Sequence, residues 1–177
     1  MKTTTFILIS LLTIFMGCDT VEKLTQFNMN YDESVVIPSN TVIDLPFQIS
    51  TPEVETNSES KFAINNTRKD MIEKIILIKM SLTLTSPDGE DFSFLESINI
   101  YIHAEGLDEV KIAWKDEISS NTEDVLDLET TGTDIQEYIK KDKFSLRIHT
   151  TTDEVLTNDH HIDVKSTYFV DAKILGL

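Results

Sequence analysis

The chain has 177 residues, 40% of them hydrophobic, and a formal net charge of −16 from 15 Lys and Arg against 31 Asp and Glu. This length favours a single domain, and the acidic charge argues against nucleic acid as a partner, because phosphate binding depends on Lys and Arg. A single cysteine excludes an intramolecular disulfide framework and a zinc site built from several cysteines.

The first eighteen residues have the pattern of a secretion signal that ends at a cysteine. Lys2 supplies a positive charge, and an apolar stretch of eleven residues, Phe6–Met16, follows it. That stretch suits the core of a signal peptide and is shorter than the roughly 20 residues that a membrane-spanning helix needs. Gly17 and Cys18 come next, and Cys18 is the only cysteine of the chain.

This order of features resembles the lipobox of bacterial lipoproteins, in which the cysteine becomes the lipidated N-terminus. The resemblance implies a signal peptide over residues 1–17, lipidation of Cys18 and a lipidated tether over residues 18–24. Losing residues 1–17 removes one lysine and no acid, so the formal charge becomes −17. An uncleaved anchor or a buried N-terminal helix is the alternative interpretation. Asp19 is compatible with inner-membrane retention or, as in Bacteroidetes-type lipoproteins, with outer-membrane or surface display.

The residues after the tether alternate between apolar and polar, which is the pattern of half-buried strands. Residues 27–31 and 35–37 predict two short strands, and a turn follows at 38–40. Residues 43–49 predict another strand, in which Pro46 favours an edge position or a bulge. Residues 51–60 have few apolar side chains and are expected to form a loop, and residues 67–73 are expected to form a short helix.

The clearest strand spans residues 76–84. Its expected inward row is Ile76, Ile78, Met80, Leu82 and Leu84. The intervening positions from Lys79 onward are polar, so one face of this strand should be buried and the other exposed to water. The turn signal Pro87-Asp88-Gly89 follows it.

The rest of the chain repeats this pattern. Further inward rows are Ile98, Ile100 and Ile102; Val110, Ile112 and Trp114; Leu126 and Leu128; Phe144, Leu146 and Ile148; and Ile162, Val164, Tyr168, Val170, Ala172 and Ile174. Trp114 is therefore expected in the core, whereas Tyr101 has outward parity. Residues 133–141 predict a helix that buries Ile135, Tyr138 and Ile139.

About eight short strands with turns between them favour an all-β fold. Parallel strands would need long crossover helices, so we expect an antiparallel β-sandwich, similar to immunoglobulin or transthyretin domains, with one or two short helices. It should occupy residues 25–177 as a single domain.

Few residues suggest chemistry. The run Asn158–Asp163 holds His160 and His161, whose side chains would point to opposite faces of a strand, so a polar turn is the preferred interpretation and no metal site is expected. His103 and His149 lie at outward parity on other strands. Residues 88–91 are acidic but lack the spacing of a calcium loop. No G-x-S-x-G motif is present, so we expect no catalytic residues, no cofactor and no enzymatic activity.

The sequence thus predicts a lipid-anchored β-sandwich protein of the cell envelope, most simply in the outer membrane, with a non-enzymatic binding role. It resembles uncharacterised β-sandwich lipoproteins of Bacteroidetes-type bacteria, a resemblance that assigns no functional residue. The ligand would be a protein partner or a glycan, and the alternative role is a structural subunit of an envelope or secretion complex. A row of exposed aromatic side chains would favour a glycan, and an unpaired edge strand or an apolar loop would favour assembly.

Overall fold

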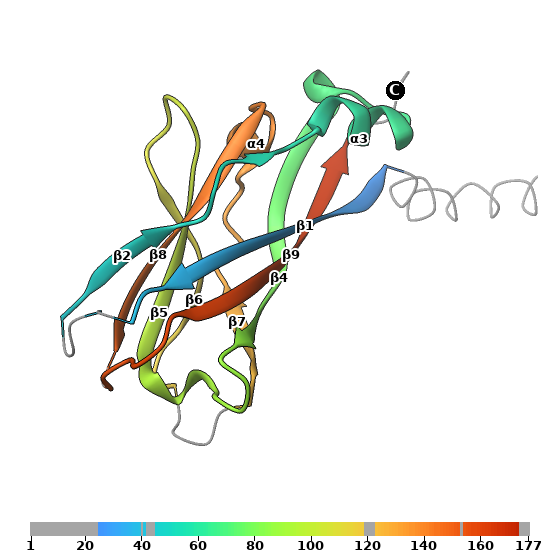
Figure 1. Cartoon of the computed structure of the whole chain (residues 1–177). Helices are drawn as coiled ribbons and strands as arrows, with labels where there is room; N and C mark the ends of the chain where they lie inside the picture. Colours follow the sequence, from blue (N-terminus) through green and yellow to red (C-terminus); the bar gives the residue numbers. More distant parts are fainter. Residues whose placement is uncertain (1–24, 40, 42–44, 119–122, 153, 174–177) are drawn as a thin grey trace, which may run out of the picture.

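The computed structural model describes residues 25–39, 41, 45–118, 123–152 and 154–173 (Figure 1). The strands in this part of the chain are β1 (Gln26–Ile37), β2 (Phe47–Ser50), β3 (Val54–Glu55), β4 (Ile72–Ser86), β5 (Leu95–His103), β6 (Val110–Lys115), β7 (Val125–Thr130), β8 (Lys143–Thr152) and β9 (His160–Ala172). The helices are α3 (Ser58–Ile64) and α4 (Gln136–Ile139), with the 3₁₀ turns η2 (Lys69–Met71) and η3 (Phe92–Phe94). The predicted signal peptide, Cys18 and the tether lie outside the described residues.

The strands pair as a nested series. β1 pairs with β9, β2 with β8, β4 with β7 and β5 with β6, and every pair is antiparallel. The full order is β1-β9-β4-β7-β6-β5-β8-β2, with the short β3 beside β8. The chain is therefore a long antiparallel ribbon rolled into two layers, which is the strand order of a jelly roll.

The predicted antiparallel all-β fold with short helices is confirmed. The strand order refines it, because immunoglobulin domains combine their strands as ABED and CFG and do not nest them in this way. One layer holds β1, β9, β4 and β7, and the other holds β2, β8, β5 and β6 (Figure 1). The pairing of β6 with β7 joins the two layers.

The core lies between the layers and is built from the inward rows of the strands. The predicted inward residues of β5, β7, β8 and β9 that the structure describes are all buried: Ile98, Ile100, Ile102, Leu126, Leu128, Phe144, Leu146, Ile148, Ile162, Val164, Tyr168, Val170 and Ala172. Ile174 lies outside the described residues. The alternating pattern therefore identified most of this core correctly.

The inward row of β4 differs from the prediction because the strand carries a β-bulge. Leu77 pairs with Tyr168 and Lys79 with Thr167, so Ile78 is an extra residue without a partner on β9. The bulge reverses the parity of the strand. Ile75 and Leu77 are buried, whereas Ile76 is partly exposed and Ile78 is 44% exposed. The prediction that Ile76 and Ile78 face the core is wrong, and that for Met80, Leu82 and Leu84 is confirmed.

A second bulge moves Trp114 out of the core. Ile100 of β5 pairs with Ala113 and Tyr101 pairs with Lys111, so β6 has one extra residue, Ile112, at this point. Ile112 and Ala113 are both buried as a result. Trp114 then faces outward and is partly exposed, so the prediction of a core tryptophan is wrong.

The N-terminal elements also differ in detail from the prediction. β1 is one continuous strand of twelve residues where two short runs were expected, and Glu33 takes an inward position within it. The predicted loop at 51–60 contains β3 and the start of α3. The predicted helix at 67–73 is only the 3₁₀ turn η2. β2 confirms the second half of the strand expected over 43–49, and residues 43 and 44 lie outside the described part of the chain.

The helices close one end of the sandwich (top of Figure 1). α4 is shorter than the predicted helix, but Ile135 just before it and Tyr138 and Ile139 within it are buried as expected. Asp134 fixes it to the sheet, because its Oδ1 atom accepts hydrogen bonds from the backbone N–H groups of Ile75 (3.0 Å) and Gln136 (3.1 Å).

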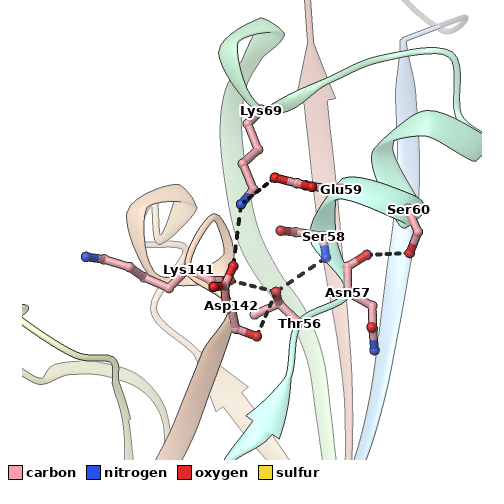
Figure 2. A network of polar contacts seen from close by, with 8 residues as sticks. All are labelled: Thr56, Asn57, Ser58, Glu59, Ser60, Lys69, Lys141 and Asp142. Atoms are coloured by element: carbon pink, nitrogen blue, oxygen red, sulfur yellow. Dashed lines mark hydrogen bonds and ion pairs between the residues drawn. The ribbon is translucent and has the colours of Figure 1, made fainter.

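A polar network ties β3 and α3 to the start of β8 (Figure 2). The hydroxyl of Thr56 donates to the carbonyl of Lys141 at 2.6 Å and accepts from the N–H of Ser58 at 3.3 Å. Lys69 lies 3.3 Å from Glu59 and 3.8 Å from Asp142. Because Thr56 bridges main-chain groups and is buried, we assign this network to the stability of the fold.

Candidate binding face

Aromatic and polar side chains gather on the outer surface of the β2-β8-β5-β6 layer. Asn99 of β5 pairs with Trp114 of β6 on one side and with His149 of β8 on the other. Tyr101 pairs with Lys111 and Arg147 in the next row. Cross-strand partners project from the same face of a sheet. We call the surface formed by Asn99, Tyr101, Lys111, Trp114, Arg147 and His149 the aromatic face.

Three planar rings project from this face, and two of them are in contact. The rings of Tyr101 and His149 lie 4.5 Å apart between centroids, with 33° between their planes. The ammonium group of Lys111 lies 5.7 Å from the centre of the Trp114 ring, within the range of a cation–π contact. All three rings are partly exposed, although the Nε2 atom of His149 is itself buried.

Charged and polar groups surround the rings and hold one another in place. Arg147 Nη1 lies 2.9 Å from Glu109 Oε2, and His149 Nε2 lies 3.8 Å from Glu109 Oε1. Lys111 Nζ donates to the side-chain oxygen of Asn99 at 3.4 Å. These contacts restrict the rotamers of long side chains, so the face is held in shape before any ligand arrives.

The sequence did not point to this face, although it placed Tyr101 outward. The alternation predicts Trp114 in the core, and it gives only outward parity for His149. The residues come from β5, β6 and β8, between 99 and 149 in the chain, and only the strand order brings them together. The one sequence feature that could have indicated this face is the outward position of Tyr101 and His149, because their strands, β5 and β8, pair with each other.

In the run Asn158–Asp163, His160 is buried and contacts the loops that hold Glu90 and Asn158. His160 is 1% exposed, its Nε2 atom lies 2.6 Å from Glu90 Oε2, and its Nδ1 atom lies 2.9 Å from the carbonyl of Asn158. The Phe94 ring packs 4.4 Å away. His161 points outward and is exposed. The two neighbouring histidines thus face opposite ways, as the sequence indicated.

The other acidic residues near this run also have local roles. Asp159 accepts a hydrogen bond from the backbone N–H of Ser39 at 2.8 Å, and this bond lowers the pKa of its carboxyl group. Asp91 accepts from the N–H of Ser93 and so begins η3. Within the described ranges, no three His, Cys, Asp or Glu side chains are placed to hold one metal ion.

A buried carboxyl group lies inside the sandwich. Glu33 is 9% exposed, and neither of its oxygens has a hydrogen-bond partner among the described residues. Burial and the neighbouring charge of Asp32 raise its pKa to about 7, and Lys61 opposes the shift. Burial and Glu33 likewise raise the pKa values of Tyr31 and Tyr168. Glu33 is therefore a titratable group within the core near neutral pH, and its inward parity on β1 was the only sequence signal for it.

β1 also forms one edge of the sheet. It is the first strand in the sheet order and pairs with β9, with no strand paired to its other side in the described structure. The segment after β3 leans against its middle, where the Tyr31 hydroxyl donates to the carbonyl of Thr56 at 2.7 Å and Lys61 Nζ donates to the carbonyl of Asn30 at 3.2 Å. β1 is therefore a second surface with unpaired backbone groups that a partner could use.

Comparison with known proteins adds little for this chain. No protein-family model and no curated protein matches it. A solved structure titled "Desmodium yellow mottle tymovirus" is similar, with 12% sequence identity over 85% of this chain and 91% of that chain, and a TM-score of 0.30. A likeness this weak carries no argument about fold or function. Within the described part of the chain, no helix has the length and apolar character needed to cross a membrane.

Proposed function

We propose that this chain is a lipid-anchored binding protein of the cell envelope, without enzymatic activity, that takes a glycan or a protein partner on the aromatic face. The observation that supports it is that Trp114 and the contacting rings of Tyr101 and His149 project from one outward face of the sheet. Aromatic side chains combine a large apolar area with polar edges and few rotatable bonds, which makes them effective contact residues.

The polar groups of the face support a binding role. Arg147 and His149 both approach Glu109, and Lys111 is held by Asn99. Catalysis by a nucleophile needs that group within hydrogen-bond reach of a base, with the base oriented by a third group. The contacts on the face instead fix charged side chains around rings, an arrangement suited to contact with a ligand.

The second candidate function is that of an assembly subunit in an envelope complex. The observation that favours it is the edge of β1, to which no strand of the described structure is paired and which carries Val36, 41% exposed, near its end. An extended segment of a partner could add a strand there and gain main-chain hydrogen bonds.

The binding role can be tested with the single tryptophan of the chain, because Trp114 lies on the aromatic face. We expect its fluorescence emission to change when the protein is titrated with either the polysaccharide fraction or the protein fraction of the cell envelope. Emission that is unchanged by both fractions would contradict the use of this face.

Anchoring depends on Cys18, the only cysteine. We expect Cys18→Ala to abolish both fatty-acid labelling in cells and recovery of the protein in the membrane fraction, because the thiol that carries the lipid is gone. Asp19→Asn, which keeps the cysteine, should be labelled as well as the parent chain. Labelled, membrane-bound Cys18→Ala protein would show that the anchor lies elsewhere.

A further inference from the structure

The side chains of the aromatic face favour one class of ligand. The inference drawn from them rests on the binding role proposed above. We infer that its ligand is an uncharged glycan chain of linked hexose units. The other possible occupant, a protein surface, is an outcome of the test below.

The rings match the shape of sugar residues. One face of a hexose ring is lined by C–H groups and is apolar, while its hydroxyl groups project around the rim. Trp114 on β6 and His149 on β8 lie on either side of β5, two strand spacings or about 10 Å apart. That distance is close to twice the spacing of linked hexose rings, so two units of a chain that are separated by one other unit could stack on Trp114 and on the pair formed by Tyr101 and His149.

The polar side chains of the aromatic face match the hydroxyl groups around a sugar ring. Neighbouring hydroxyls of a sugar can each donate and accept a hydrogen bond, so they fit side chains that offer two groups side by side. The amide of Asn99 lies between Trp114 and His149, and the guanidinium group of Arg147 is fixed by Glu109 beside them. Gln48 on β2 pairs with His149 and extends this row with an exposed amide.

The charge of the molecule favours a neutral glycan over an acidic one. The whole chain carries a formal charge of −16, which repels polyanions over distances of about 10 Å or less at physiological ionic strength. On the face itself, Arg147 is neutralised by Glu109 at 2.9 Å. A carboxylated or sulfated chain would have to compete with Glu109 for Arg147, which leaves Lys111, held by Asn99, as the cation of the face without an acidic partner among the described residues.

The composition of the face also differs from that of a protein interface. The centres of protein interfaces are enriched in aromatic residues, Met and Arg and depleted of Lys and Glu, so Lys111 and Glu109 are the residues that set this face apart. Among the described residues, none of the large exposed aliphatic side chains belongs to the aromatic face: Val36, Leu45, Ile64, Ile78, Val125 and Val155. The rings on the face are instead separated by amide and charged groups, as an alternation of stacking and hydrogen bonding to sugars requires.

The test follows Trp114 emission in the full-length protein, solubilised in detergent. The probes are four neutral polysaccharides (laminarin, glucomannan, xyloglucan and starch) and two acidic ones (alginate and polygalacturonate). We expect a saturable shift of the emission to shorter wavelength with at least one neutral probe and none with the acidic probes. Tyr101→Ala and Asn99→Ala should each weaken that binding, Tyr101→Ala by about tenfold.

The matched control is Phe169→Ala, which removes a partly exposed aromatic side chain from the outer surface of the other layer. Its affinity for the neutral probe should equal that of the parent chain. The inference is overturned if only acidic probes bind, if Tyr101→Ala and Asn99→Ala bind as tightly as the parent, or if no polysaccharide changes the emission. If no polysaccharide changes the emission but the envelope protein fraction does, the proposed binding function still holds and only the glycan inference fails. If the protein fraction does not change the emission either, the proposed function and the glycan inference both fail.

Discussion

Leu77→Asp should unfold the protein, whereas Ile78→Asp should leave it folded. Leu77 is 2% exposed between the layers, and its neighbour Ile78 is 44% exposed because it is the extra residue of the bulge in β4. A carboxylate without a partner in the core costs several kcal/mol, which is comparable with the total stability of a small domain, about 5–15 kcal/mol. On the surface, the same substitution should cost less than about 1 kcal/mol.

Urea denaturation followed by circular dichroism measures both variants against the parent chain. The sequence alone predicts the opposite ranking, because it places Ile78 inward. The two substitutions are of one type on adjacent positions, so their difference reports on which side of the strand each residue lies. Equal losses of stability, or a larger loss for Ile78→Asp, would contradict the bulge.

Stability should fall as the pH rises from about 5 to 8, and Glu33→Gln should remove most of this dependence. The pKa of Glu33 is raised from an ordinary value of 4.5 to about 7 by burial and by Asp32. Between these two values the folded state holds a proton that the unfolded state has released, so raising the pH favours unfolding. The shift corresponds to about 3 kcal/mol, fully present below pH 4.5 and lost once the pH exceeds 7.

The measurement is the free energy of unfolding of the parent chain and of Glu33→Gln at pH 5, 6, 7 and 8. The two proteins should be most similar at pH 5, and Glu33→Gln should be the more stable at pH 8. Glu73→Gln, which changes an exposed carboxylate on β4, is the matched control and should keep the pH dependence of the parent. A difference between parent and Glu33→Gln that stays constant with pH would show that Glu33 is not the titrating group.

The strands that could be predicted from the sequence are those whose two faces differ. β9 keeps one inward row from Ile162 to Ala172, interrupted only by Ser166, and every member of it is buried. In β4, by contrast, residues 75–78 are all aliphatic. Local alternation cannot assign a face to such a run, so the register with β9 decides it, and that register depends on contacts far along the chain.

The aromatic face was hidden for the same reason. In β6, Ile112 and Ala113 are adjacent and apolar, so a bulge that buries both costs little, and it turns Trp114 toward the solvent. The position of the rings on one surface also depends on β6, β5 and β8 being neighbours. That order is set by the nested pairing of the whole ribbon, which no local pattern contains. The parity of Tyr101 and His149 was correct, but their proximity could not be read from it.

Nitrogen-labelled NMR spectra of the chain from Asp19 onward, titrated with envelope polysaccharide and protein fractions, can show whether the aromatic face is the ligand surface. The indole N–H of Trp114 gives a resonance of its own, because the chain has one tryptophan. The account predicts that this resonance and backbone amides of β5, β6 and β8 shift together, while amides of β1 do not. Shifts confined to β1 (Gln26–Ile37), with the Trp114 resonance unmoved, would contradict it and would favour partner binding at the sheet edge.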